Sequence, residues 1–122
     1  MAMYAPFFET VRDIAAVKII FGNSPRIAPH GVADQNTETP YAVFQMVNGA
    51  PENFLKARPD ADSYTLQIDV YAKTPQRAAD GAQAIRDAIE PHAYVVAWRG
   101  QFKDPDTSLF RYSFDIDWIV QR

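Results

Sequence analysis

Strict alternation of apolar and polar residues marks two segments of the chain as β-strands. From Tyr64 to Ala72 every second residue is apolar, with tyrosine or polar residues between. From Leu109 to Val120 one side is aromatic and aliphatic, whereas the other carries an arginine, a serine and two aspartates. Because successive side chains of a strand point to opposite faces, each segment predicts a strand with one face in the core.

Weaker patterns predict further extended segments. Tyr41 to Asn48 alternates after Pro40, and proline is tolerated at the start of a strand. Tyr94 to Phe102 precedes a turn at Lys103–Thr107 that contains Asp-Pro-Asp, so it should form a hairpin with the last strand. Arg26 to Pro29 is compatible with a short extended piece, and residues 30–39 are polar and aperiodic, which predicts a loop.

Helical spacing of apolar residues predicts two helices. The first spans Pro6 to Phe21, although the apolar run at its end also fits a short strand. The second follows Thr74-Pro75, a capping residue followed by a proline in the first turn, and continues to about Ile89. Its apolar stripe is mostly alanine, which allows a close approach to a sheet.

The order helix, strand, strand, helix, strand, strand predicts an α+β fold in a single domain over residues 1–122. We expect one sheet, mostly antiparallel, of four to five strands, with two helices packed on one face. The second helix could alternatively form a crossover between parallel neighbouring strands. A long loop at about residues 49–63 interrupts the pattern.

Composition excludes several classes of protein. The 122 residues include no cysteine, which excludes a disulfide framework, a thiolate zinc site and an iron–sulfur cluster. A formal net charge of -3 lacks the basic footprint of most nucleic-acid-binding proteins, so we expect no sequence-specific nucleic-acid partner. Apolar stretches are too short for a spanning helix, and we expect no membrane partner.

Three strand aspartates are the candidate chemical groups. Asp69, Asp115 and Asp117 could form an acid–base pair on a sheet face. All three lie on the polar side of their strands, so we favour a solvated face with Arg111 or Lys73 as cross-strand partners. On this interpretation Asp69→Asn should cost little stability.

No motif indicates a catalytic residue, a metal or a cofactor. The two histidines, His30 and His92, lack the spacing with which one element presents two metal ligands. The glycines form no phosphate-binding motif, and a nucleophile-elbow motif is missing. We therefore expect neither a metal site nor a cofactor.

The long loop is the candidate partner interface. Between two prolines it places an apolar pair, Phe54 and Leu55, beside Lys56 and Arg58. Such a segment can order on contact with a partner or fold back on the body of the domain. We expect these four residues, together with Lys103 in the later turn, to contact a partner.

A series of short motifs runs in a recognisable order from about residue 10 to residue 120. They are Arg26-Ile27 with Pro29 and Gly31, Pro40-Tyr41 before Val43-Phe44-Gln45, Asn48-Gly49, Leu66 to Ala72, Ala78 and Ala82 before Ala84 to Ile89, and Arg111 to Trp118. In order and spacing the chain resembles the tail completion protein family of long-tailed bacteriophages and prophages. The loop at 49–63 carries no motif of that family.

The resemblance implies a non-enzymatic assembly protein without cofactors. Members of the family are expected to form a ring, typically a hexamer, on the head-proximal end of the tail tube. The ring ends tube polymerisation and joins the tail to the head, so the implied partners are further copies of the chain, the tail tube protein and the head-connector protein. The implied locations are the bacterial host cytoplasm during assembly and the virion tail.

Two other classes of function stay open at this stage. One is a small enzyme or ligand-binding domain that uses Asp69, Asp115 and Asp117. The other is a regulatory or adaptor domain whose long loop recognises a protein partner.

Overall fold

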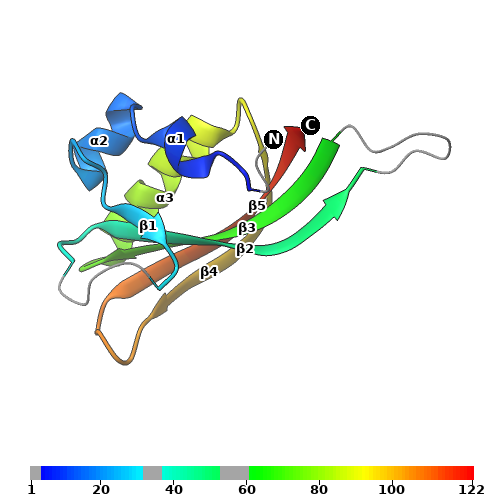
Figure 1. Cartoon of the computed structure of the whole chain (residues 1–122). Coiled ribbons are helices and arrows are strands. Elements are labelled where there is room, and N and C mark those ends of the chain that lie inside the picture. The colour runs from blue at the N-terminus through cyan, green and yellow to red at the C-terminus, as the bar shows by residue number, and fades with distance from the viewer. Residues whose placement is uncertain (1–3, 32–36, 53–60) are drawn as a thin grey trace, which may run out of the picture.

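A computed structural model, which describes residues 4–31, 37–52 and 61–122, contains one five-stranded sheet and three helices. Figure 1 shows the helices on one side of the sheet, and the opposite side is open in this view. The predicted α+β class with one mostly antiparallel sheet is confirmed. The elements are α1 (Phe7–Val11), α2 (Ala15–Phe21), β1 (Ile27–Pro29), β2 (Tyr41–Pro51), β3 (Ala61–Ala72), α3 (Pro75–Ile89), β4 (Tyr94–Lys103) and β5 (Phe110–Gln121).

The sheet has the strand order β1-β2-β3-β5-β4. β1 runs parallel to β2, and the pairs β2–β3, β3–β5 and β5–β4 are antiparallel. The predicted hairpin between β4 and β5 is therefore present. The alternative of a crossover between neighbouring parallel strands is not realised, because β5 lies between β3 and β4.

The N-terminal helix is broken where the sequence predicts a continuous one. Ile14 has extended backbone angles, φ -77 and ψ 125, between α1 and α2. The break changes which side chains face the core: Val11 and Val17 are buried, whereas Ile14 is exposed. A straight helix over this segment would instead place Ile14 and Lys18 on the same side as Phe7 and Val11.

Helix α3 covers the centre of the sheet through small residues. Its N-terminus is capped by Thr74, whose hydroxyl accepts a hydrogen bond from the Arg77 N–H at 3.2 Å. Gly81 and Ala82 are buried at the contact. A Cβ atom on Gly81 would lie 2.8 Å from Val70 Cγ1, so the helix packs as close as a glycine allows.

The hairpin of β2 and β3 is longer than the alternating pattern predicts. Residues 49–51 and 61–63, which the sequence places in a loop, belong to strands: Gly49, Ala50 and Pro51 pair with Tyr64, Ser63 and Asp62. The predicted loop at 49–63 is therefore shorter, and its centre, residues 53–60, lies outside the described residues. Figure 1 shows this hairpin extending beyond the helices.

Candidate functional site

The register of the sheet brings the predicted aspartates onto its open face. Asp69 of β3 lies opposite Ser113 of β5, and Asp115 lies between Gln67 of β3 and Ala97 of β4. These residues alternate with the apolar side chains that pack beneath α3, so they point away from the helices. The prediction that the aspartates share one face of the sheet is confirmed.

The prediction that this face is fully solvated is wrong at its centre. Asp69 is 3% exposed and Asp115 is 7% exposed. Both lie on inner strands of the sheet, β3 and β5, and arginine side chains reach over them. Burial of a carboxylate is costly unless a charged partner accompanies it, so the partners decide what these groups can do.

An arginine lies beside each of the two buried carboxylates. The Nε and Nη2 atoms of Arg99 each lie 2.9 Å from an oxygen of Asp115, a two-pronged contact that raises the pKa of Arg99. The Nε atom of Arg111 lies 4.0 Å from Asp69 Oδ1, which confirms the predicted cross-strand partner. We call Asp69, Asp115, Arg99 and Arg111 the arginine–aspartate network.

Neighbouring polar and aromatic groups complete this network. The Gln67 side-chain amide donates to both oxygens of Asp69 at 3.3 Å. The guanidinium of Arg111 stacks on Phe102, with its carbon 4.1 Å from the ring centroid. Asp117, also on this face, accepts a hydrogen bond from the Thr65 hydroxyl. These contacts engage all three aspartates and give the network a structural role.

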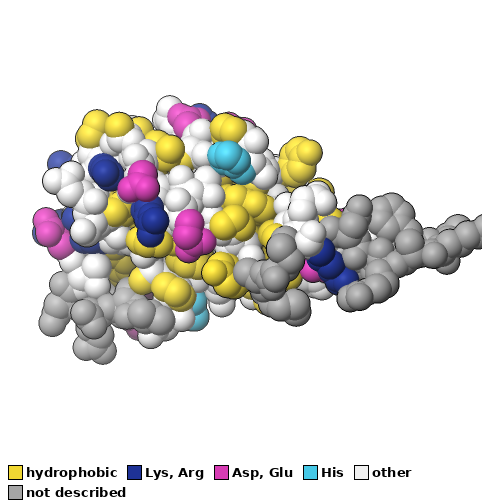
Figure 2. Space-filling view, turned by 45° about the horizontal axis from the view of Figure 1, so that its top comes forward, with side chains coloured by type: hydrophobic (Ala, Val, Ile, Leu, Met, Phe, Trp, Pro, Cys, Tyr) yellow, Lys and Arg dark blue, Asp and Glu magenta, His cyan; other side chains and the backbone are white. Residues whose placement is uncertain are grey.

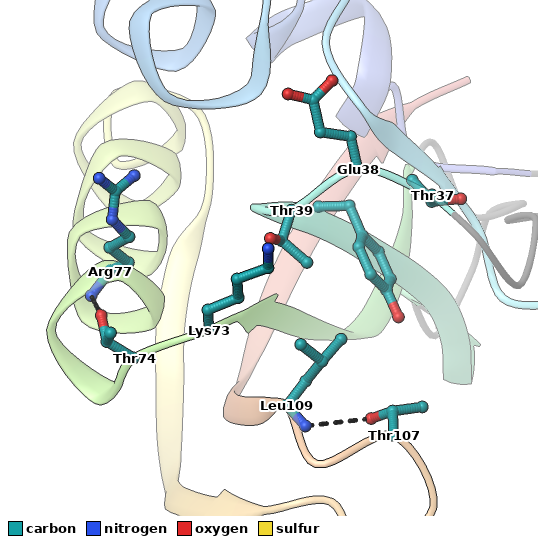
Figure 3. A pocket seen from close by; sticks show the side chains of 9 residues that line it. Thr37, Glu38, Thr39, Lys73, Thr74, Arg77, Thr107 and Leu109 are labelled. Carbon is teal, nitrogen blue, oxygen red and sulfur yellow. Dashed lines mark hydrogen bonds between the residues drawn. The ribbon is translucent and has the colours of Figure 1, made fainter.

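A surface pocket of about 880 Å³ lies at one end of the sheet (Figure 3). Lys73 and Arg77 line it together with four threonines and Glu38. Thr74 is engaged in the cap of α3, and the Thr107 hydroxyl accepts from the Leu109 N–H at 3.3 Å. The candidate aspartates do not line this pocket, so it gives no support to an acid–base site built on them.

The histidines do not combine into a metal site. His92 stacks on Trp118 with ring centroids 6.4 Å apart, whereas the backbone of His30 donates to Phe44. Within residues 4–31, 37–52 and 61–122, no group of three or more His, Asp or Glu side chains could hold a metal ion. In the same part of the chain, no helix has the length and hydrophobicity needed to cross a membrane.

Of the predicted interface residues, the structure describes one. Phe54, Leu55, Lys56 and Arg58 lie outside the described residues, and Lys103 is the exposed last residue of β4. Next to the undescribed segment, Arg122 donates to both oxygens of Asp62 at 2.8 and 3.0 Å. This hydrogen bonding lowers the pKa of Asp62 and ties the end of β5 to the start of β3.

Strand β4 is the most exposed element of the sheet, and it forms one edge. Its exposed residues include large apolar ones: Val96 is 52% exposed and Trp98 is 46% exposed. The Trp98 ring packs against two aromatic rings of β5: its centroid lies 5.1 Å from that of Phe114 and 5.7 Å from that of Tyr112. An apolar edge strand of this kind is a site at which another chain can add.

Sequence patterns alone did not identify β4 as a surface feature. The sequence predicts only a strand at Tyr94 to Phe102, and its place at the edge follows from β5 pairing between β3 and β4. Arg99 was missed for the same reason, because only the register brings it to Asp115, 16 residues away.

The comparisons with known proteins agree with one another. The family model described as "Tail completion protein gp17" matches residues 6–121. A solved structure described as "Virion of native gene transfer agent (GTA) particle" contains a chain with the same fold, with a TM-score of 0.73 and 12% sequence identity. The similarity covers 94% of this chain and 91% of that chain. A search of curated protein sequences gives no significant match.

Proposed function

Since the chain belongs to the tail completion protein gp17 family of bacteriophage structural proteins, we propose that it forms a ring on the head-proximal end of the tail tube. The proposed ring, a hexamer, stops polymerisation of the tube and provides the surface to which the head binds. The family match over residues 6–121 carries this proposal. The shared fold with a chain of a gene transfer agent virion supports a place in a virion, at the tail.

The surface of the molecule supports assembly as its mode of action. A subunit of a ring uses two different surfaces, one for each neighbour. The open edge at β4, with its large exposed apolar residues, is a suitable surface for one of them. The proposed partners are other copies of the chain, the tail tube protein and the head-connector protein, which the subunit meets in the host cytoplasm.

The open face of the sheet supports a function without catalysis. An acid–base mechanism needs carboxylates that can exchange protons with a bound substrate. Asp69 and Asp115 instead face arginines, and Asp117 accepts a hydrogen bond from Thr65. The alternative of an enzyme that uses these three aspartates gains no support from this geometry.

Electron microscopy of the purified protein mixed with polymerising tail tube protein tests the proposal. We expect density on one end of each tube and a shift of the length distribution toward shorter tubes. Bovine serum albumin at the same concentration serves as the control. Tubes with bare ends and an unchanged length distribution would overturn the proposed function.

A further inference from the structure

We propose that β4 of one subunit adds to the free outer edge of β2 in the next subunit, with Trp98 entering a groove beside β2. The inference rests on the proposed ring and names the two surfaces that would close it. The occupant of each surface is a second copy of this chain.

The first surface is the β4 patch, which we define as Tyr94, Val96, Trp98, Arg99, Phe102 and Lys103. All of these side chains are exposed. The segment Tyr94–Lys103 contains an arginine and a lysine but no carboxylate. Because Arg99 is paired with Asp115, the patch combines large apolar side chains with the positive charge of Lys103.

The second surface lies at the opposite edge of the sheet. Among the described residues, β1 pairs with β2 at Ala42 to Phe44, and the outer edge of β2 is open beyond that point. Met46 and Val47, on this open stretch, are 55% and 46% exposed. Unpaired backbone groups and exposed apolar side chains make this stretch a second acceptor for a strand.

A groove of about 520 Å³ accompanies the open stretch of β2. We call it the β2 groove; among its lining residues are Tyr4, Phe8, Pro29, Phe44, Met46 and Leu66. Glu9 also lines it, and β2 itself carries no charged residue. Figure 2 shows hydrophobic side chains interspersed with charged ones across the helix-covered side of the molecule. The groove is thus mostly apolar, with Glu9 and His30 also in its lining, and it offers an apolar site for the Trp98 ring.

Trp98 and the β2 groove lie on the same side of the sheet, whereas Arg99 and Phe102 of the patch lie on the open face. Trp98 pairs with Phe114, and Met46 pairs with Leu66; both partners are buried on the side that the helices cover. When β4 of one subunit lies beside β2 of the next, Trp98 therefore faces the β2 groove. The helices of all subunits then lie on one side of the continued sheet.

Strand direction also fits a head-to-tail contact. Each of the three steps from β2 through β3 and β5 to β4 is antiparallel, so β4 runs opposite to β2. A rotation about an axis roughly along the strands preserves their direction, and β4 then meets the neighbouring β2 in the antiparallel sense. Repetition of such a heterologous contact closes a ring when the rotation fits.

The shape of β4 limits how it can pair with a neighbouring strand. Register shifts at Val95/Ala97 and Trp98/Gly100 bend β4, which limits backbone pairing with any neighbour, including β2, to short stretches. The side chain of Trp98 in the groove then becomes a main source of specificity.

Cysteine crosslinking tests this contact cleanly because the chain contains no cysteine. Val96→Cys is made in one preparation and Val47→Cys in another, with Ala50→Cys as a second β2 position that covers a different register. We expect a disulfide-linked dimer when a β4 variant is mixed with a β2 variant, at least ten times the yield of either variant alone. The double variant should give a ladder of crosslinked oligomers. Ile19→Cys, at an exposed position on α2, is the matched control.

Crosslinking is scored in concentrated solution and on tail tubes, after thermal denaturation has shown that each variant is folded. Efficient crosslinking of Val96→Cys with itself, or a mixed yield no higher than that of the Ile19→Cys control, would overturn the inference even if the wild type caps tubes. Mixed crosslinking without capping of tubes would support the contact and overturn the proposed function alone.

Discussion

At the scale of single residues, the arginine–aspartate network shows how a sheet face can be polar and buried at once. Each carboxylate lies on an inner strand, and an arginine from β4 or β5 reaches over it. Removing one member of a buried pair is costly because it leaves the other charge without a partner. The expected cost depends on how far the remaining arginine can reach water.

Asp69→Asn should destabilise the protein by about 1–2 kcal/mol, because Arg111 loses its counterion. The loss stays below the roughly 3–5 kcal/mol of a fully buried pair, since the Arg111 side chain is 31% exposed and rests on Phe102. The expected loss of stability for Asp69→Asn is therefore larger than the small loss expected for an aspartate on a fully solvated sheet face. Urea denaturation measures it, with Asp13→Asn as an exposed control. Equal stability of the two variants would show that the pair contributes nothing.

At the scale of elements, regular patterns predicted most of the fold. Alternation located β3 and β5, and the Thr74-Pro75 cap located the start of α3. The break at Ile14 could not be predicted, because apolar spacing continues through it and only the shape of the core favours the break. The outer ends of β2 and β3 show no clear alternation of apolar and polar residues. They form strands because they pair with each other.

Gly81→Ala tests the close packing of α3 on the sheet. The new methyl group would lie 2.8 Å from Val70 Cγ1 and 3.0 Å from Phe21 Cζ, which forces these groups apart. Overpacking costs about 1–3 kcal/mol, and we expect it to outweigh the gain of about 1 kcal/mol in helix propensity. The melting temperature should fall, whereas the exposed control Gln83→Ala should leave it unchanged or slightly higher. A higher melting temperature for Gly81→Ala would mean that α3 shifts freely.

At the scale of the whole molecule, the order of short motifs identified the family, but the sites of contact were harder to predict. Phe54 and its neighbours lie outside the described residues, so their role as a partner interface stays a prediction. The exposure of the β4 patch depends on which strand forms the edge of the sheet. That depends on pairing between distant segments, which local patterns do not reveal.

Deleting residues 54–58 separates folding from assembly. The flanking strands pair up to Pro51 and Asp62, and Arg122 holds Asp62, so the domain should fold without the segment. Loop length changes stability by only about 0.6 kcal/mol for each doubling. We expect a melting temperature within a few degrees of the wild type and weaker capping of tail tubes in electron microscopy. A glycine–serine replacement of equal length distinguishes lost side chains from lost length, and a collapse in stability would place the segment in the core.

The arginine–aspartate network also has a consequence for how the sheet assembles correctly. Side chains alternate along β5, so a slip of one residue against β3 would turn Asp115 toward α3 and Phe114 toward the open face. Such a mispaired sheet would bury an unpaired carboxylate among apolar side chains and expose an aromatic ring. The network thus makes the shifted register energetically unfavourable during folding. A subunit that must fit identical neighbours gains from having one accessible arrangement.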